Sequence, residues 1–150
     1  MQSPTVPFRL PADRLAEQLA QFNARAEVQW FGFAGAFQQP GSALITFTRS
    51  NEGLQGGGGT AAINGGVIAA GFDAAFVLAG LGQYDTPVVV TLELSVKFLS
   101  LALVDKPLAF QAHAVRSAKN FSFAEGFLAP VGAAAGPHMA IATAMVAPAR

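Results

Sequence analysis

The sequence contains no cysteine and few charged residues, and both absences narrow what the protein can be. Without cysteine it has no disulfides and no thiolate ligands for a metal ion. Charged residues make up only 12% of the chain, which is roughly half of their share in an average soluble domain. Nine basic and nine acidic residues cancel, so no overall field attracts nucleic acid, and any bound anion has to be held locally.

The low charge accompanies a high content of hydrophobic residues, 52% of a chain of 150 residues. A chain of this length fits one ordinary domain, so we expect a single domain over residues 1–150. So few charged groups cannot cover the surface of a monomer. The excess apolar surface must therefore enter a membrane or be buried against other copies of the chain.

A membrane-spanning run is also missing from the sequence. The stretch nearest to the required length, residues 61–82, carries Asp73 at its middle and several glycines, which make insertion unfavourable. Residues 1–11 contain no apolar run and only one charge, Arg9, unlike a signal peptide. We therefore expect a cytoplasmic homo-oligomer with neither a membrane nor a nucleic-acid partner.

The first third of the chain predicts one helix and two strands. Residues 12–22 place Leu15, Leu19 and Phe22 on one stripe, which is typical of an amphipathic helix. Two β-prone runs follow, residues 26–38 and 42–50, and the QPG sequence between them indicates a hairpin turn.

The second part predicts a helix followed by four strands. Residues 64–81 are too long for a typical strand and apolar on nearly every side, which predicts a fully buried helix with Asn64 as its N-cap. Residues 88–100 alternate, with Val88, Val90 and Leu92 beginning the apolar face and Thr91 beginning the polar face. The remaining strand-like runs are residues 108–116, 120–129 and 138–147. This order predicts an α+β fold in which about six antiparallel strands wrap around one central helix.

Asp73 is the strongest candidate for chemistry. A carboxylate in the middle of an apolar helix loses solvation, and such a cost often marks a functional site. The alternative is a structural role in which Asp73 faces a polar seam or caps a backbone amide.

A second candidate, Asn64-Gly65-Gly66, opens the same helix. Free backbone amides at a helix N-terminus can hold a carbonyl oxygen or an anion, although an ordinary N-cap explains the motif as well. Nine residues separate Asn64 from Asp73, which corresponds to about 13 Å of helical rise. If both belong to one site, the amides must come from a second subunit across a two-fold axis.

The remaining candidates carry weaker signals. Thr91 can position a water, and Arg116 and Lys119 bracket a turn where they can meet phosphates. A solvated surface side chain is the simpler explanation of Thr91, and a solvated turn explains Arg116 and Lys119 equally well. His113 and His138 have no paired nucleophile, so we expect structural roles for both. The sequence shows no metal-ligand cluster and no pattern for a cofactor.

Taken together, these residues resemble the hotdog-fold acyl-CoA thioesterases of the phenylacetate-degradation type. That family begins its central helix with His-Gly-Gly and places an acidic residue nine positions after the histidine, a spacing matched by Asn64-Gly65-Gly66 and Asp73. The runs VTLELSVKFLS at 90–100 and VRSAKNFSFAEG at 115–126 are also similar to family segments. The resemblance covers residues 60–147.

The resemblance implies hydrolysis of an acyl-CoA without a cofactor. Asp73 would act as general base or nucleophile, and the Gly65 amide of the partner subunit would polarise the thioester carbonyl. Asn64 and Thr91 fall at the thioester-orienting and water-orienting positions. Gly66, Arg116, Lys119, Phe72 and Phe76 are the expected substrate-binding residues. A dimer or a dimer of dimers would complete the site.

Two departures from the family pattern leave other functions open. Asn64 replaces the usual histidine, and Gly58 replaces a loop asparagine or glutamine. These changes favour, as the alternative, a non-catalytic protein that binds acyl-CoA or a related ligand. A hydratase or dehydratase is the third possible function, but the expected pairing of an aspartate with a histidine is missing from the sequence.

Overall fold

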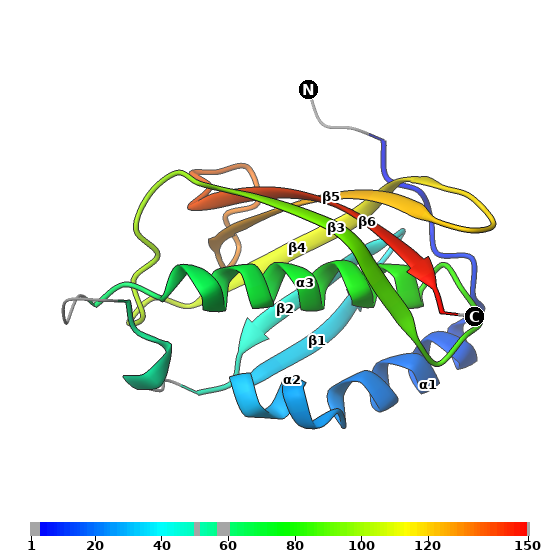
Figure 1. The fold of residues 1–150 in the computed structure, drawn as a ribbon, viewed down its shortest axis with the longest axis horizontal. Helices are drawn as coiled ribbons and strands as arrows, with labels where there is room; N and C mark the ends of the chain where they lie inside the picture. The colour runs from blue at the N-terminus through cyan, green and yellow to red at the C-terminus, as the bar shows by residue number, and fades with distance from the viewer. Residues whose placement is uncertain (1–3, 50–51, 57–60, 150) are drawn as a thin grey trace.

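A computed structural model describes residues 4–49, 52–56 and 61–149 as one antiparallel sheet curved around a long helix (Figure 1). The six strands are β1 (Phe33–Gln38), β2 (Ser42–Phe47), β3 (Val89–Phe98), β4 (Leu108–Ser117), β5 (Ser122–Pro130) and β6 (Ala140–Pro148). They lie in the order β1-β2-β4-β5-β6-β3, and every neighbouring pair is antiparallel. The expected α+β fold with a six-stranded sheet and a central helix is confirmed.

The central helix, α3 (Gly65–Leu81), packs its larger side chains against the concave face of the sheet. Gly71 permits this close approach, because a Cβ atom there would lie 2.2 Å from the ring of Phe110. The expectation of a helix buried on all sides is wrong, since Ala70, Asp73 and Ala74 are half-buried. Among the described helices, none is long and apolar enough to cross a membrane.

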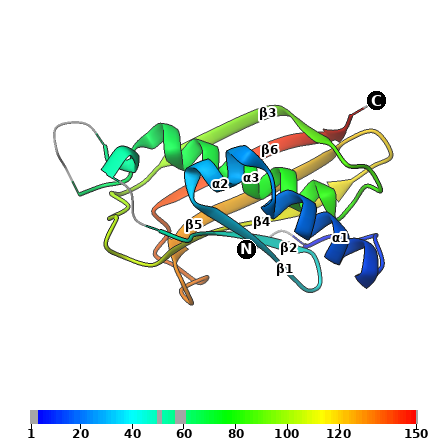
Figure 2. The ribbon, with the colours of Figure 1, turned by 90° about the horizontal axis from the view of Figure 1, so that it is seen from below.

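Two shorter helices, α1 (Ala12–Asn23) and α2 (Ala26–Phe31), lie beside α3 on the side away from the middle of the sheet (Figure 2). Helix α1 is the expected amphipathic helix. Its Gln18 is 1% exposed and donates hydrogen bonds to the carbonyls of Leu81, Tyr84 and Thr86. This side chain fixes α1 to the end of α3.

Helix α2 corrects the expectation that residues 26–38 form one β-prone run. The chain is helical to Phe31, turns at Gly32 with φ of 72°, and becomes extended only in β1. Arg49 donates to the carbonyls of Gln29 and Trp30, two of the groups that a helix C-terminus leaves without intrahelical partners. A left-handed glycine and a distant arginine thus stabilise a helix that local periodicity does not predict.

Strand β3 is an edge of the sheet and contains a β-bulge that reverses its side-chain alternation. Thr91 and Glu93 occupy successive pairing positions opposite Val146 and Met145, so Leu92 is an extra residue. Val89 is therefore buried, whereas Val90 and Leu92 are exposed. The expectation that Val88, Val90 and Leu92 share the buried face is wrong, because the inserted residue shifts the two-residue period.

Candidate functional site

The bulge in β3 brings Thr91 onto the side of the strand that faces α3. Its hydroxyl donates a hydrogen bond of 2.5 Å to Oδ1 of Asp73. Alternation alone predicts that Thr91 points away from the helix, and the extra residue Leu92 explains the difference. Asp73 is thus half-buried and held in place by a neighbouring strand. Its Oδ2 atom makes no hydrogen bond within the described part of the chain.

A cavity of about 440 Å³ opens in front of this pair and is bounded by α2, α3 and the start of β3. Apart from Asp73 and Thr91, its walls are mostly apolar, and the charged side chains of Arg25 and Glu27 complete them. A carboxylate at the wall of an apolar cavity is the usual arrangement of a group that acts on a bound molecule.

The N-terminus of α3 has the expected cap, with Asn64 Oδ1 accepting a hydrogen bond of 2.7 Å from the Gly66 amide. Asn64, Gly65 and Gly66 are exposed. The Gly65 amide donates no hydrogen bond to any residue that the structure describes, so it is available to an acceptor. The ring of Phe98, at the end of β3, lies beside Gly65.

Within one chain these two parts of the site are separate. Gly65 and Asp73 lie on one continuous helix, and eight residues correspond to about 12 Å of rise. A general base and an oxyanion donor both have to lie about 3 Å from the group that reacts. One chain alone therefore does not bring the Gly65 amide and Asp73 to the same carbonyl.

Phe72 and Phe76 do not belong to a binding pocket, which corrects their expected role. Both side chains are 0% exposed. Phe72 lies 5.1 Å from Phe110 and 6.1 Å from Phe76, measured between ring centroids. They point from α3 into the space under the sheet and form the core, because the apolar face of α3 that they occupy is the one that the sheet covers.

Arg116 and Lys119 are exposed at the turn between β4 and β5. This turn lies near the C-terminal end of α3, where the Tyr84 hydroxyl donates to the carbonyl of Ala118. Neither side chain is among those that line the cavity at Asp73. The expectation for Gly58 concerns a residue that lies outside the described part of the chain.

The sequence did not indicate that His113 has an acidic neighbour. His113 Nε2 lies 3.2 Å from Glu125 Oε1, although without the angle of a hydrogen bond. Both face the outer side of the sheet and, with Ser42 and Thr143, line a groove of about 670 Å³. Antiparallel register, which pairs His113 with Glu125, is the signal that could have shown this contact.

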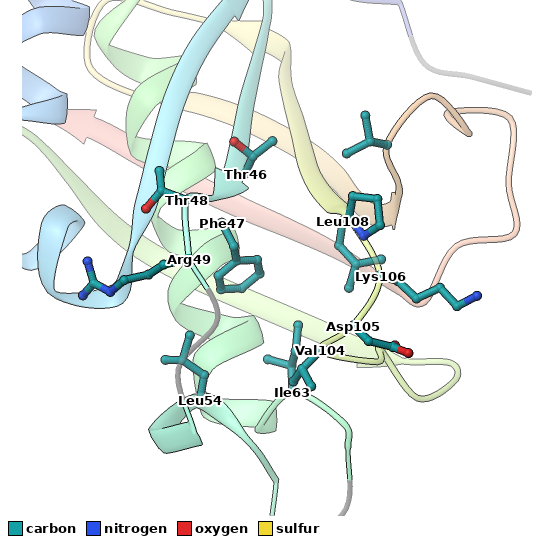
Figure 3. A pocket seen from close by; sticks show the side chains of 12 residues that line it. Thr46, Phe47, Thr48, Arg49, Leu54, Ile63, Val104, Asp105, Lys106 and Leu108 are labelled. Carbon is teal, nitrogen blue, oxygen red and sulfur yellow. The ribbon is translucent and has the colours of Figure 1, made fainter.

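Another pocket, of about 370 Å³, lies where β2 ends and β4 begins (Figure 3). Figure 3 shows the apolar side chains Phe47, Leu54 and Ile63 around it, with Arg49 and Lys106 extending from opposite sides. It does not include Asp73 or Thr91. No group of three or more His, Asp or Glu residues in the described ranges could hold a metal ion.

Comparisons with known proteins agree with this geometry. Residues 61–128 match the family model of the thioesterase superfamily, a segment that contains Gly65, Asp73 and Thr91. No curated protein matches the sequence closely enough to count as a relative.

Several solved structures share the fold at low sequence identity. The PaaI protein of Escherichia coli, from the phenylacetic acid degradation operon, is 16% identical with a TM-score of 0.77, over 93% of this chain and 96% of that chain. A mutant thioesterase from Pseudomonas aeruginosa is also 16% identical, with a TM-score of 0.76 over 95% and 97% of the two chains. A thioesterase family protein from Silicibacter pomeroyi is 18% identical, with a TM-score of 0.73 over 89% and 96%.

The fold, the position of the acid on α3 and the family match define a hotdog-fold protein. Residues 61–128 match the thioesterase superfamily, and the chain shares the fold of the PaaI protein, in agreement with the resemblance found in its motifs. The match over residues 61–128 supports thioester hydrolysis as the general class of reaction.

Proposed function

We propose that this protein hydrolyses an acyl-CoA to the free acid and CoA, with Asp73 as general base or nucleophile. The observation that carries the proposal is the Asp73 carboxylate, held by Thr91 at the wall of an apolar cavity. The single hydroxyl proton of Thr91 is donated to Asp73, so the Thr91 oxygen can only accept from a water. A water bound there lies beside the carboxylate that would take its proton.

The Gly65 amide of the partner subunit would polarise the thioester carbonyl. Gly65 is exposed, its amide donates to no acceptor in the described part of the chain, and it lies at the positive end of the α3 dipole. An amide directed at the developing oxyanion is often the largest single contribution to catalysis of acyl transfer. The distance along α3 requires a second copy of the chain to supply it.

The β3 edge is the surface through which we propose that two copies pair. Leu92 and Phe98 on this strand and Val88 just before it are exposed, and no strand in the described part of the chain pairs with its outer side. Antiparallel pairing about a two-fold axis at Ser95 sets Glu93 opposite Lys97 of the partner subunit, so that opposite charges meet. Because Leu92 is bulged out, the next pair is Thr91 with Phe98 of the partner subunit.

This register would bring the two halves of the site together, because each end of β3 contacts one of them. Thr91 is bonded to Asp73, and Phe98 lies beside Gly65. Pairing Thr91 with Phe98 of the partner subunit therefore carries the partner's Gly65 toward Asp73. We propose a dimer as the repeating unit and, from the family resemblance alone, a dimer of dimers. The exposed cations Arg116 and Lys119 would contact the phosphates of CoA.

A non-catalytic protein that binds acyl-CoA is the second candidate, and the cap on α3 favours it. The Asn64 oxygen is already bonded to the Gly66 amide, so only its amide NH₂ group is left to orient a thioester. A histidine at this position would present a ring nitrogen instead. The binding function predicts uptake of acyl-CoA without release of thiol.

Measuring thiol release from a dozen acyl-CoAs by the wild type and by Asp73→Asn separates the two functions. The amide oxygen can still accept from Thr91, so the melting temperature should stay the same or rise. Hydrolysis should fall by about 10² or more, the usual effect of losing a general base. Asp105→Asn, at an exposed position, is the matched control. If Asp73→Asn retained full hydrolysis, Asp73 would not be the catalytic acid.

A further inference from the structure

The cavity in front of Asp73 is built mainly from apolar side chains of three helices and two strands. Helix α3 contributes Ala70, Ala74 and Val77, which share one helical face with Asp73. The opposite wall comes from the end of α1, from α2 and from the start of β1. Its apolar members are Phe22, Val28, Phe31 and Phe33.

Helix α2 forms a fixed wall. Val28 is 3% exposed, and the ring of Phe31 stacks on Phe33 with centroids 5.1 Å apart. Gly32, with φ of 72°, ends the helix, and Arg49 holds its last carbonyls. The position of Phe31 therefore depends on contacts within the fold.

Apart from Asp73, the charged residues that line the cavity lie at the start of α2. Arg25 donates to the carbonyl of Pro87 and lies 5.6 Å from the ring centroid of Phe22, while Glu27 is exposed. The pantetheine and nucleotide of CoA carry polar groups and charges that need water or partners. The apolar interior can accept only the other side of the thioester, its acyl group.

We propose that this cavity binds an uncharged, apolar acyl group and that Ala70 and Phe31 limit its length. The inference rests on the proposed hydrolysis at Asp73 and names its substrate class. Alanine at position 70 leaves room one turn before the acid, and Phe31 limits the space from the other wall. The cationic lining residue, Arg25, lies at the start of α2 and donates to the carbonyl of Pro87, whereas Phe31 ends that helix. An acyl group that ended in a carboxylate between Ala70 and Phe31 would bury its charge among apolar side chains, so such substrates should be poor.

Filling and enlarging the cavity test this proposal. In Ala70→Leu, kcat/KM for octanoyl-CoA should fall by about tenfold or more, while that for acetyl-CoA changes little, because a few methylenes decide the fit. In Phe31→Ala the preferred chain should become longer. Ala69→Leu places the same side chain on α3 outside the cavity lining and should keep the wild-type profile. Benzoyl-CoA and succinyl-CoA extend the series to an aromatic and to a charged acyl group.

A binding measurement separates failure of this proposal from failure of the hydrolysis. In Asp73→Asn, octanoyl-CoA should raise the melting temperature more than CoA does, and adding Ala70→Leu should remove that difference. If no acyl-CoA released thiol but this difference was found, hydrolysis would be wrong and the acyl cavity would stand. If hydrolysis occurred with the same chain-length profile in Ala70→Leu and Ala69→Leu, the acyl cavity would be wrong. Efficient hydrolysis of succinyl-CoA would also overturn it.

Discussion

Asp73 owes its environment to a neighbouring strand as much as to its own helix. A lone carboxylate on an apolar helix would be costly, but this one is half-buried and accepts a hydrogen bond from Thr91. A carboxylate that stays partly hydrated and accepts a charge-assisted hydrogen bond costs the folded protein little stability. The residue is therefore compatible with the fold while one carboxylate oxygen stays free to react.

Replacing Thr91 by valine tests the role of its hydroxyl. Thr91→Val keeps the shape of the side chain but removes the donor, so both Asp73 and the attacking water lose their orientation. We expect hydrolysis to fall by about tenfold to a hundredfold, with a stability loss of only about 1 kcal/mol because water can replace the hydroxyl. Thr143→Val, at an exposed position of β6, should change neither. Full activity in Thr91→Val would contradict a water-orienting role.

Asn64→His tests whether asparagine weakens the site. If the family histidine orients the thioester, this variant should raise thiol release from the best acyl-CoA. It loses the cap to the Gly66 amide, so its free energy of unfolding should drop by up to about 1 kcal/mol. Asn64→Ala loses the same cap without gaining an imidazole and should be no faster than the wild type. An unchanged rate in a folded Asn64→His protein would count against this role of position 64.

At the scale of the elements, the close contact between α3 and the sheet determines which helix face is left for chemistry. Gly71 lies against Phe110, which is 0% exposed and in contact with Phe33, Phe47 and Phe72. Tight packing on this face turns the half-buried face of α3, with Ala70, Asp73 and Ala74, away from the sheet.

Gly71→Ala should therefore destabilise the protein although alanine favours helices. The gain in helix propensity is at most about 1 kcal/mol, whereas overpacking in a core costs about 1 to 3 kcal/mol. Because the Cβ would lie 2.2 Å from a buried ring, the steric cost should win. Chemical denaturation measures the loss. Phe110→Leu should reduce the penalty when combined with Gly71→Ala, and strict additivity of the two changes would argue against this contact.

At the scale of the whole molecule, the shortage of charge and the exposed apolar edge of β3 both favour association with another copy of the chain. Leu92 and Phe98 are 59% and 56% exposed on a strand with an open edge, and Val88, just before it, is 46% exposed. An unprotected edge of this kind favours pairing with another strand. Hotdog thioesterases are generally oligomeric, and an oligomer fits this chain.

The absence of cysteine allows a direct test of the proposed two-fold axis. In Ser95→Cys, each new thiol should lie opposite its own copy, at a Cα separation of about 5 Å that a disulfide can bridge. Mild oxidation should then give a covalent dimer on a non-reducing gel. Thr143→Cys, which pairs with Ser95 from the next strand inward, should stay monomeric on the same gel. A monomer by light scattering at micromolar concentration would rule out the shared site.

The sequence by itself determined the α+β class, the central helix and the candidates Asp73 and Asn64-Gly65-Gly66, because periodicity, helix capping and motif spacing are local properties. Tertiary structure decided what depends on contacts between distant segments. The bulge at Leu92 turns Thr91 toward Asp73, and the sheet covers Phe72 and Phe76. Contacts to Gln29 and Trp30 from Arg49 stabilise α2, which was expected to be a strand. One inserted residue changes the face on which a side chain lies, and one distant arginine stabilises a helix where a strand was expected. Neither effect can be read from a local sequence pattern.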